Sequence, residues 1–139
     1  MIRVVLDTNI LVSALISPAG NPARIYSAWE DGTFTLLCCA QQFEELRSTL
    51  QKPRVAVLIK PHTAGHLVNQ MKKLTEDIGP LPRVTRSPDP NDDFLLAMAE
   101  AGKADYLVTG DESGLLALHR HRGTQIVSAS AFARVVRLN

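Results

Sequence analysis

Acidic side chains stand beside apolar segments at four well-separated places in the sequence. The four places are Asp7 in VVLD, the pair Glu44-Glu45 in FEEL, the pair Asp92-Asp93 in DPNDDF, and Asp111 in LVTGD. A carboxylate next to buried apolar residues costs free energy unless it is capped, paired or bound to a ligand. Each of these acids therefore needs a structural role or a chemical one.

Each acid has an ordinary structural explanation. Asp7 can cap the helix that follows it, and Asp111 can belong to a turn after Gly110. The pair at 44–45 can lie on a solvated face, and the pair at 92–93 can favour the dipole at a helix N-terminus. Taken together, these explanations do not account for why all four acidic places lie either at the end of a predicted strand or near the start of a predicted helix.

The hydropathy pattern alternates between short apolar runs and segments with helical spacing. The predicted strands are 2–6, 34–40, 105–111 and 124–128. The predicted helices are 9–17, a segment from 21 through Trp29, 41–51, most of 55–78, 91–104, a short turn from Ser113, and 129–138. In these, the stripes Leu67, Met71, Leu74, Ile78 and Phe94, Leu95, Met98, Ala101 are expected to face inward. The Pro-rich stretch 81–90 is linker-like but too short to separate two domains.

Solid apolar strands alternating with helices indicate a central, mainly parallel sheet that is covered on both faces. Right-handed crossovers then give a three-layer α/β/α sandwich, and we expect residues 1–139 to form one domain. In such sheets, ligands bind outside the carboxyl ends of the strands. The fold therefore predicts that the four acidic places converge on one edge.

Carboxylates crowded at one edge repel each other, and a divalent cation removes that repulsion. An oxygen-only ligand set favours Mg²⁺ or Mn²⁺ over zinc. His62 and His66 have i, i+4 spacing but no third ligand, and His119 and His121 are expected in loops or polar positions. No glycine-rich phosphate loop and no G-x-S-x-G elbow is present, which argues against nucleoside triphosphate and α/β-hydrolase chemistry.

The composition is that of an ordinary globular chain, with 45% hydrophobic and 21% charged residues and a net charge of +1. This net charge gives no strong basic field of the kind that indicates a nucleic-acid-binding protein, but it does not exclude one, because a neutral protein can carry a local basic patch. Adjacent cysteines rarely form a disulfide, so Cys38 and Cys39 are expected to be reduced and buried. Asp7 and Asn9 interrupt the N-terminal apolar run, and no stretch has the length that a bilayer needs. We therefore expect a cytoplasmic protein with no membrane association.

Three segments in this order resemble the PIN-domain nucleases, in particular the VapC-type toxin subgroup. They are VVLDTNILVSAL, FEEL and DPNDDFLLAMAEAGKADYLVTGD, and the D-T-N opening and L-V-T-G-D are the specific parts. The resemblance spans essentially the whole chain. It implies an endoribonuclease that uses Mg²⁺ or Mn²⁺ to cleave single-stranded or loop RNA. It also implies a homodimer and a toxin role in a toxin–antitoxin pair, with an antitoxin protein as partner.

The resemblance assigns the catalytic and metal-binding roles to one set of acids: Asp7, Glu45, Asp92 and Asp111. Asn9, Thr109 and Asp93 are the implied supporting residues. Within the two acidic pairs, the register stays open by one residue, so Glu44 and Asp93 are alternative ligands. The expected substrate-holding cations are Arg24, Arg47, Lys52, Arg54 and Arg86. Tyr26, Trp29, Phe34 and the apolar residues of 55–78 exceed what one small core obviously needs, which favours the dimer.

Two alternatives use the same fold differently. A non-enzymatic PIN domain would bind RNA or a partner protein, and the intact set of four acids argues against it. A receiver-like phospho-accepting domain usually has two acids at the end of its first strand and a lysine at its fifth. Here, the first strand ends in the single acid Asp7, and TQIVS contains no lysine.

Overall fold

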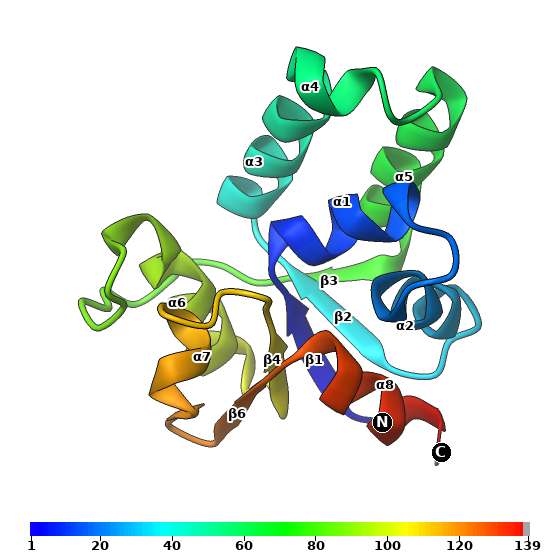
Figure 1. Ribbon diagram of the computed structural model, residues 1–139. Coiled ribbons are helices and arrows are strands. Elements are labelled where there is room, and N and C mark those ends of the chain that lie inside the picture. Colours follow the sequence, from blue (N-terminus) through cyan, green and yellow to red (C-terminus); the bar gives the residue numbers. More distant parts are fainter. Residues whose placement is uncertain (138–139) are drawn as a thin grey trace.

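A computed structural model describes residues 1–137 of the chain. Its centre is a six-stranded sheet in the order β3-β2-β1-β4-β6-β5, parallel except for the β5–β6 pair (Figure 1). The strands are β1 (Arg3–Leu6), β2 (Thr35–Cys38), β3 (Thr75–Asp77), β4 (Tyr106–Val108), β5 (Arg120–His121) and β6 (Thr124–Val127). The predicted mainly parallel sheet is confirmed.

Alternate residues of the central strands serve two different cores. In β1, Val4 and Leu6 belong to one hydrophobic cluster, whereas Val5 belongs to the other. In β2, Leu36 and Leu37 divide in the same way. Because successive strand side chains point to opposite faces, an unbroken apolar run is what a sheet covered on both sides requires.

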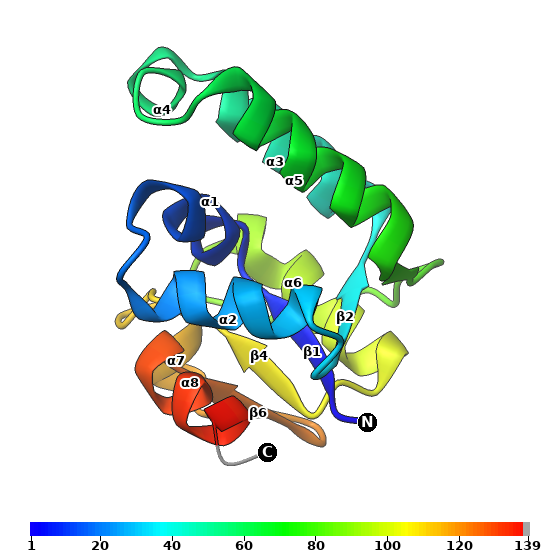
Figure 2. The same ribbon diagram turned by 90° about the vertical axis from the view of Figure 1, so that its right-hand side faces the viewer.

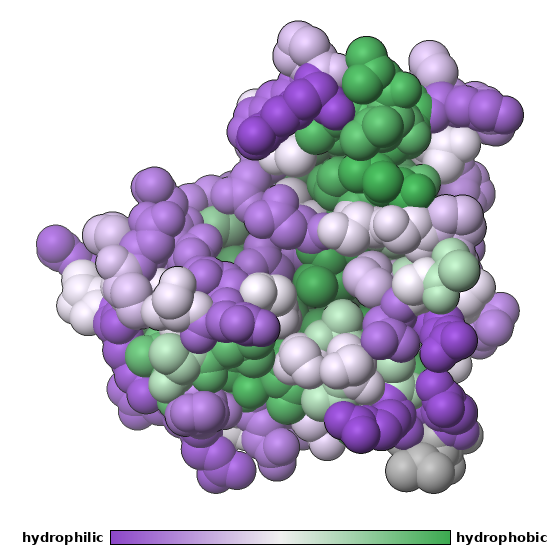
Figure 3. Space-filling view, viewed as in Figure 1, coloured by the Kyte–Doolittle hydropathy of each residue, from purple (hydrophilic) through white to green (hydrophobic). Residues whose placement is uncertain are grey.

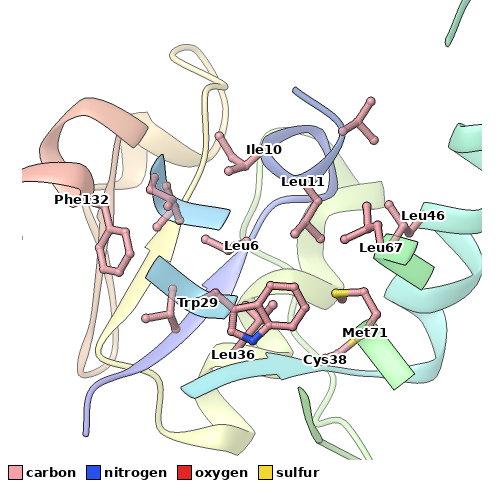
Figure 4. Close-up of a cluster of buried hydrophobic side chains, with 14 of the residues drawn as sticks. Leu6, Ile10, Leu11, Trp29, Leu36, Cys38, Leu46, Leu67, Met71 and Phe132 are labelled. Atoms are coloured by element: carbon pink, nitrogen blue, oxygen red, sulfur yellow. The ribbon is translucent and has the colours of Figure 1, made fainter. Parts of the chain in front are cut away.

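Helices cover both faces of this sheet and give the predicted three layers. One face carries α1 (Thr8–Ile16), α2 (Asn21–Glu30) and α8 (Ala129–Arg137). The opposite face carries α6 (Asp93–Gly102) and α7 (Leu115–Leu118). Figure 4 shows the first core, in which Leu6, Trp29 and Phe132 are almost completely buried.

Helices α3 (Ala40–Gln51), α4 (Pro53–Ala56) and α5 (Pro61–Leu74) form an arm beside α1 (Figures 1 and 2). The arm contributes three buried side chains to the first core beside α1: Leu46 of α3, and Leu67 and Met71 of α5. At the far side of α5, the Glu30 carboxylate of α2 accepts hydrogen bonds from His66 and Gln70. The arm is thereby fixed relative to the sheet, and with it the side chains that α3 presents.

The prediction of one helical segment over 55–78 was wrong in two respects. Residues 57–60 interrupt it before α5 begins at Pro61, and the chain then becomes strand β3 after Leu74. Leu74 is 47% exposed, so it does not continue the buried stripe of Leu67 and Met71. The short polar strand TED carries no apolar alternation, and only its pairing with β2 identifies it.

Smaller differences occur elsewhere. Ala101 is exposed, and Gly102 is the buried residue at that turn of α6, where a Cβ would lie 2.6 Å from Leu37 Cδ1. The predicted strand 105–111 is shorter, ending at Val108, and β5 was not expected. The short 3-10 helix η1 (Pro90–Asp92) ends the irregular stretch that begins at 81. The end of the last predicted helix, at 138, lies outside the described residues.

Both cysteines are free and buried, as predicted. Burial raises the pKa of the Cys38 thiol to about 12, so it stays protonated near neutral pH. Among residues 1–137, no helix combines the length and apolar character needed to cross a bilayer.

Candidate active site

A cleft of about 640 Å³ opens where β1 and β4 end, at the edge at which α1 leaves β1 in Figure 1. The residues that line it are Asp7, Asn9, Glu45, Thr49, Lys52, Arg54, Asp89, Asp92, Gly110 and Asp111. All four acidic places singled out in the sequence therefore contribute to one concave surface. They come from the residue that follows β1, from α3, from η1 and from the segment after β4.

Asp7 combines the two roles that the sequence left open. It is the N-cap of α1, where its Oδ1 accepts a long 3.4 Å hydrogen bond from the backbone N–H of Asn9. Its Oδ2 accepts a 2.8 Å hydrogen bond from the Thr109 hydroxyl. Asp7 is only 9% exposed. Since the capping bond is long, capping alone does not explain a buried carboxylate at this position.

Thr109 joins the two strand-end acids. Its buried hydroxyl donates to Asp7 and accepts the 3.2 Å hydrogen bond of the Asp111 backbone N–H. The Asp111 carboxylate in turn accepts a 3.1 Å hydrogen bond from the backbone N–H of Gly114. A Cβ on Gly114 would overlap Asp111 Oδ2, so only glycine at 114 lets the carboxylate occupy this place.

The two members of the 92–93 pair have different surroundings. Asp93 Oδ1 accepts hydrogen bonds from the backbone N–H groups of Arg86 (3.1 Å) and Ser87 (2.7 Å), and it does not line the cleft. Asp92 lines the cleft, and its carboxylate has no hydrogen-bond partner among the described residues. Asp93 thus holds the preceding loop, whereas the Asp92 oxygens remain available to a ligand.

Helix α3 presents one face to the cleft. Glu45, Thr49 and Lys52 line it at helical spacing, while Glu44 does not. One turn earlier, buried Gln42 donates a 2.6 Å hydrogen bond from Nε2 to the backbone oxygen of Leu6. This bond ties α3 to the end of β1, immediately before Asp7. Glu45 is exposed to solvent within the cleft.

Burial and neighbouring carboxylates raise the pKa values of Asp7 and Asp92. Burial, and then the charges of Asp7, Asp89, Asp111 and Glu45, raise the pKa of Asp92 to about 6. Burial also raises the pKa of Asp7 against the hydrogen bonds from Thr109 and Asn9, and the charge of Asp111 adds to the rise. A cation would relieve this repulsion.

The donors suit a hydrated hard cation. No three His, Cys, Asp or Glu side chains within residues 1–137 are grouped so that they could hold a metal ion by themselves. Mg²⁺, however, usually keeps several waters and takes one or two carboxylates, with substrate phosphate completing its shell. Asp7, Asp92 and Asp111 supply oxygen donors of this kind, and the unpartnered Asp92 carboxylate is the most available of them.

Sequence reasoning missed some residues of the cleft and misplaced others. Asp89 was not anticipated, although D-P-N at a helix start is a capping signal, and its Oδ1 indeed accepts the backbone N–H of Asn91. Of the five expected substrate-holding cations, only Lys52 and Arg54 line the cleft. Arg24, Arg47 and Arg86 do not. His121 is buried in β5 rather than in a loop or polar position.

We expect the affinity for metal to decrease as the pH is lowered, because a proton competes with the cation for the Asp92 carboxylate. As pH falls from 7 to 5, this carboxyl, with a pKa of about 6, becomes mostly protonated and stops being a ligand. The dissociation constant for Mn²⁺, measured by isothermal titration calorimetry, should rise about tenfold over this range.

The metal-free protein should show the opposite trend in stability. The folded-state pKa of Asp92, about 6, lies above its ordinary value of 3.8. Its protonated form therefore stabilises the fold at low pH, and this contribution is lost as pH rises through about 6. Asp92→Asn should reduce both pH trends, while Asp31→Asn, an exposed acid outside the cleft, should change neither. Unchanged trends in Asp92→Asn would contradict the assignment.

Comparison with known families adds one finding. A family model described as PIN domain matches residues 3–113, which is most of the chain. A search of curated proteins gave no match.

Proposed function

Because this chain belongs to the PIN-domain family, we propose that it is an endoribonuclease that uses Mg²⁺ or Mn²⁺ to cleave phosphodiester bonds of single-stranded or loop RNA. PIN domains are generally nucleases, which use divalent metal ions. The observation that carries the proposal is the meeting of acids from four separate segments in one cleft. An open cleft reaches an exposed backbone more easily than a duplex, and RNA recognition mostly targets unpaired segments.

We assign the ion to the part of the cleft lined by Asp7, Asp92 and Asp111, where one or two of these carboxylates would bind it directly and the others through water. Glu45 lies on the α3 wall of the cleft. A bound Mg²⁺ or Mn²⁺ neutralises phosphodiester charge and lowers the pKa of an attacking water. Thr109 fixes the orientation of the Asp7 carboxylate by donating its hydroxyl proton to Oδ2. Glu45, exposed in the cleft, would accept hydrogen bonds from the waters that complete the shell of the ion.

The cleft also needs cations, because five carboxylates line it and RNA is a polyanion. Lys52 and Arg54 lie where α3 gives way to α4, and both line the cleft. We propose that they hold substrate phosphates next to the cleaved bond. Their position on the arm places positive charge across from the strand-end acids rather than among them.

Replacing Lys52 and Arg54 together by glutamine should weaken substrate binding more than the chemical step. We expect KM to rise about tenfold at moderate salt with kcat within about threefold, because contacts made equally in ground and transition states change KM alone. Steady-state cleavage of a fluorogenic RNA measures both parameters.

Arg47→Gln is the matched control, since it removes a cation from α3 that does not line the cleft. It should leave both parameters near those of the parent. Equal effects of Arg47→Gln and of the double variant would show that bulk charge, not the cleft, holds the substrate.

The deciding experiment incubates the protein with structured and single-stranded RNAs in Mn²⁺, Mg²⁺ or EDTA. We expect cleavage only with metal and preferentially in unpaired segments. Cleavage that persists in EDTA would overturn the mechanism. RNA binding without cleavage in either metal would favour the non-enzymatic PIN alternative.

We further propose that the protein is a homodimer and the toxin of a toxin–antitoxin pair. Trp29 and Phe34 are each 2% exposed in the chain's own core, so they give the dimer no support, contrary to the expectation from the sequence. Support comes from Val57 (80% exposed) and Leu58 (59% exposed), which directly follow α4. Figure 3 shows a hydrophobic area over this end of the arm. An antitoxin protein would place a basic side chain in the acidic cleft.

Sedimentation velocity tests the dimer directly. We expect a dimer at micromolar concentration that dissociates when Val57 and Leu58 are both changed to serine, because the change removes exposed apolar contact area. A monomer for the parent protein at this concentration would contradict the proposal.

A further inference from the structure

A second concave surface, of about 550 Å³, lies at the β5–β6 hairpin and is lined by Arg86, Leu118, Arg120, His121 and Arg122. We call it the arginine pocket. Three guanidinium groups meet there in a chain whose net charge is only +1. None of these residues lines the acidic cleft, so the proposed function does not account for them.

Arg86 is held in place inside this pocket. Its Nη1 donates a 2.6 Å hydrogen bond to the backbone oxygen of Arg120 and lies 3.0 Å from His121 Nδ1. An arginine can only donate, so Nδ1 must be the acceptor and the His121 proton is on Nε2. His121 Nε2 donates to Glu100 Oε1 at 2.9 Å, and the imidazole is buried.

The pocket keeps an excess of positive charge after its internal pairing. Glu100 accepts from His121 and also pairs with Arg122 Nε at 3.3 Å. The Asp93 carboxylate, which accepts the backbone N–H groups of Arg86 and Ser87, is a second negative charge nearby, so two carboxylates stand against three guanidinium groups. The Nε and Nη2 atoms of Arg86 and the whole Arg120 guanidinium have no hydrogen-bond partner among residues 1–137.

We propose that the arginine pocket binds a backbone phosphate of the RNA, outside the cleft; the choice of RNA rests on the proposed function. Planar guanidinium groups match phosphate oxygens with paired N–H donors. All three arginines are exposed, but the bonds made by Arg86 Nη1 hold this side chain in place before any ligand binds. Through Asp93, the Arg86 loop is bonded to the start of α6, beside Asp92 of the cleft, so one strand can follow the surface from one site to the other.

The test measures binding alone, with a 20-nucleotide single-stranded RNA carrying a fluorescent label, in EDTA. The variant is Arg120→Gln with Arg122→Gln, which leaves the Arg86 anchor intact. We expect the dissociation constant to rise about five- to tenfold near 0.1 M salt, and the slope of log K against log salt to fall by about 0.7, the value for one lost phosphate contact on a single strand.

Two controls separate the pocket from general charge. Arg134→Gln with Arg137→Gln removes the same charge from exposed positions of α8 and should leave affinity within about twofold. Arg120→Lys with Arg122→Lys should keep the salt slope but lose affinity, since lysine lacks the paired donors. Thermal denaturation checks that each variant is folded.

Equal losses in the pocket and α8 variants, or no loss in either, would overturn the proposal. Because no cleavage is measured, the result is independent of the nuclease assignment. If the parent protein binds RNA through the pocket but never cleaves it, the pocket stands and the nuclease proposal fails. If the parent protein cleaves RNA and the pocket variant binds normally, the pocket fails alone.

Discussion

Asp7→Asn should abolish metal-dependent RNA cleavage while leaving the protein folded. The change keeps one side-chain oxygen that can cap α1, and the new Nδ2 can donate to the Thr109 hydroxyl oxygen in place of the present bond, but the charge that holds a cation is removed. We expect kcat/KM to fall by at least about 100-fold, because even outer partners of a metal site cost about 10–100-fold when lost. Single-turnover cleavage with saturating Mn²⁺ measures the loss.

The same substitution should keep or raise the melting temperature of the metal-free protein. Burial and the charge of Asp111 raise the pKa of Asp7, so the ionised carboxylate is destabilising at neutral pH and its removal relieves the fold. Asp31→Asn is the matched control for charge removal outside the cleft and should leave cleavage unchanged. A strong loss of stability in Asp7→Asn would instead make capping the main role of Asp7.

Topology explains why the sequence indicated this edge of the sheet correctly. Asp7 and Asp111 follow solid apolar strands, and the carboxyl ends of parallel strands meet at one edge. Their side chains are linked through Thr109, whose place two residues before Asp111 was visible in the motif. The pattern therefore carried both the fold class and the convergence of distant acids.

Periodicity could not decide between neighbouring acids. Glu44 and Glu45 differ by about 100° around α3, and only the packing of Gln42 against the end of β1 sets which of them faces the cleft. Asp93 differs from Asp92 in its hydrogen bonds, because backbone N–H groups of the preceding loop donate to Asp93 and not to Asp92. Such long-range hydrogen bonds leave no periodic signal in the sequence.

The polar edge elements were missed for a related reason. The strand TED has no apolar residue to mark it, and it exists because its backbone pairs with β2 and Glu76 pairs with Arg3 at 2.6 Å. Strand β5 is two residues long and was hidden in an Arg- and His-rich stretch. A short polar strand at a sheet edge is specified by its partners rather than by its own hydropathy.

Gly114→Ala should disable the site from a position that carries no functional group. The added Cβ would overlap Asp111 Oδ2, and the carboxylate would have to leave the place where it accepts the Gly114 N–H. We expect a loss of about 10–100-fold in Mn²⁺ affinity and in cleavage, as for other displaced partners of a metal. Because the atoms that must move belong to the half-exposed Asp111 side chain and not to the core, the free energy of unfolding, measured by urea denaturation, should change by less than about 1 kcal/mol.

Two glycine controls and one double variant test whether this effect passes through Asp111. In Gly65→Ala, the added Cβ meets no atom within 4 Å, and the change should stabilise α5 by about 0.5–1 kcal/mol. A Cβ at Gly110 also meets no atom within 4 Å, so Gly110→Ala is the control for adding a methyl group inside the cleft without a steric overlap. In an Asp111→Asn background the acidic ligand is already gone, so adding Gly114→Ala should lower Mn²⁺ affinity little further. Independent, additive losses would mean that Gly114 matters for the fold of the α7 turn rather than for the position of the carboxylate.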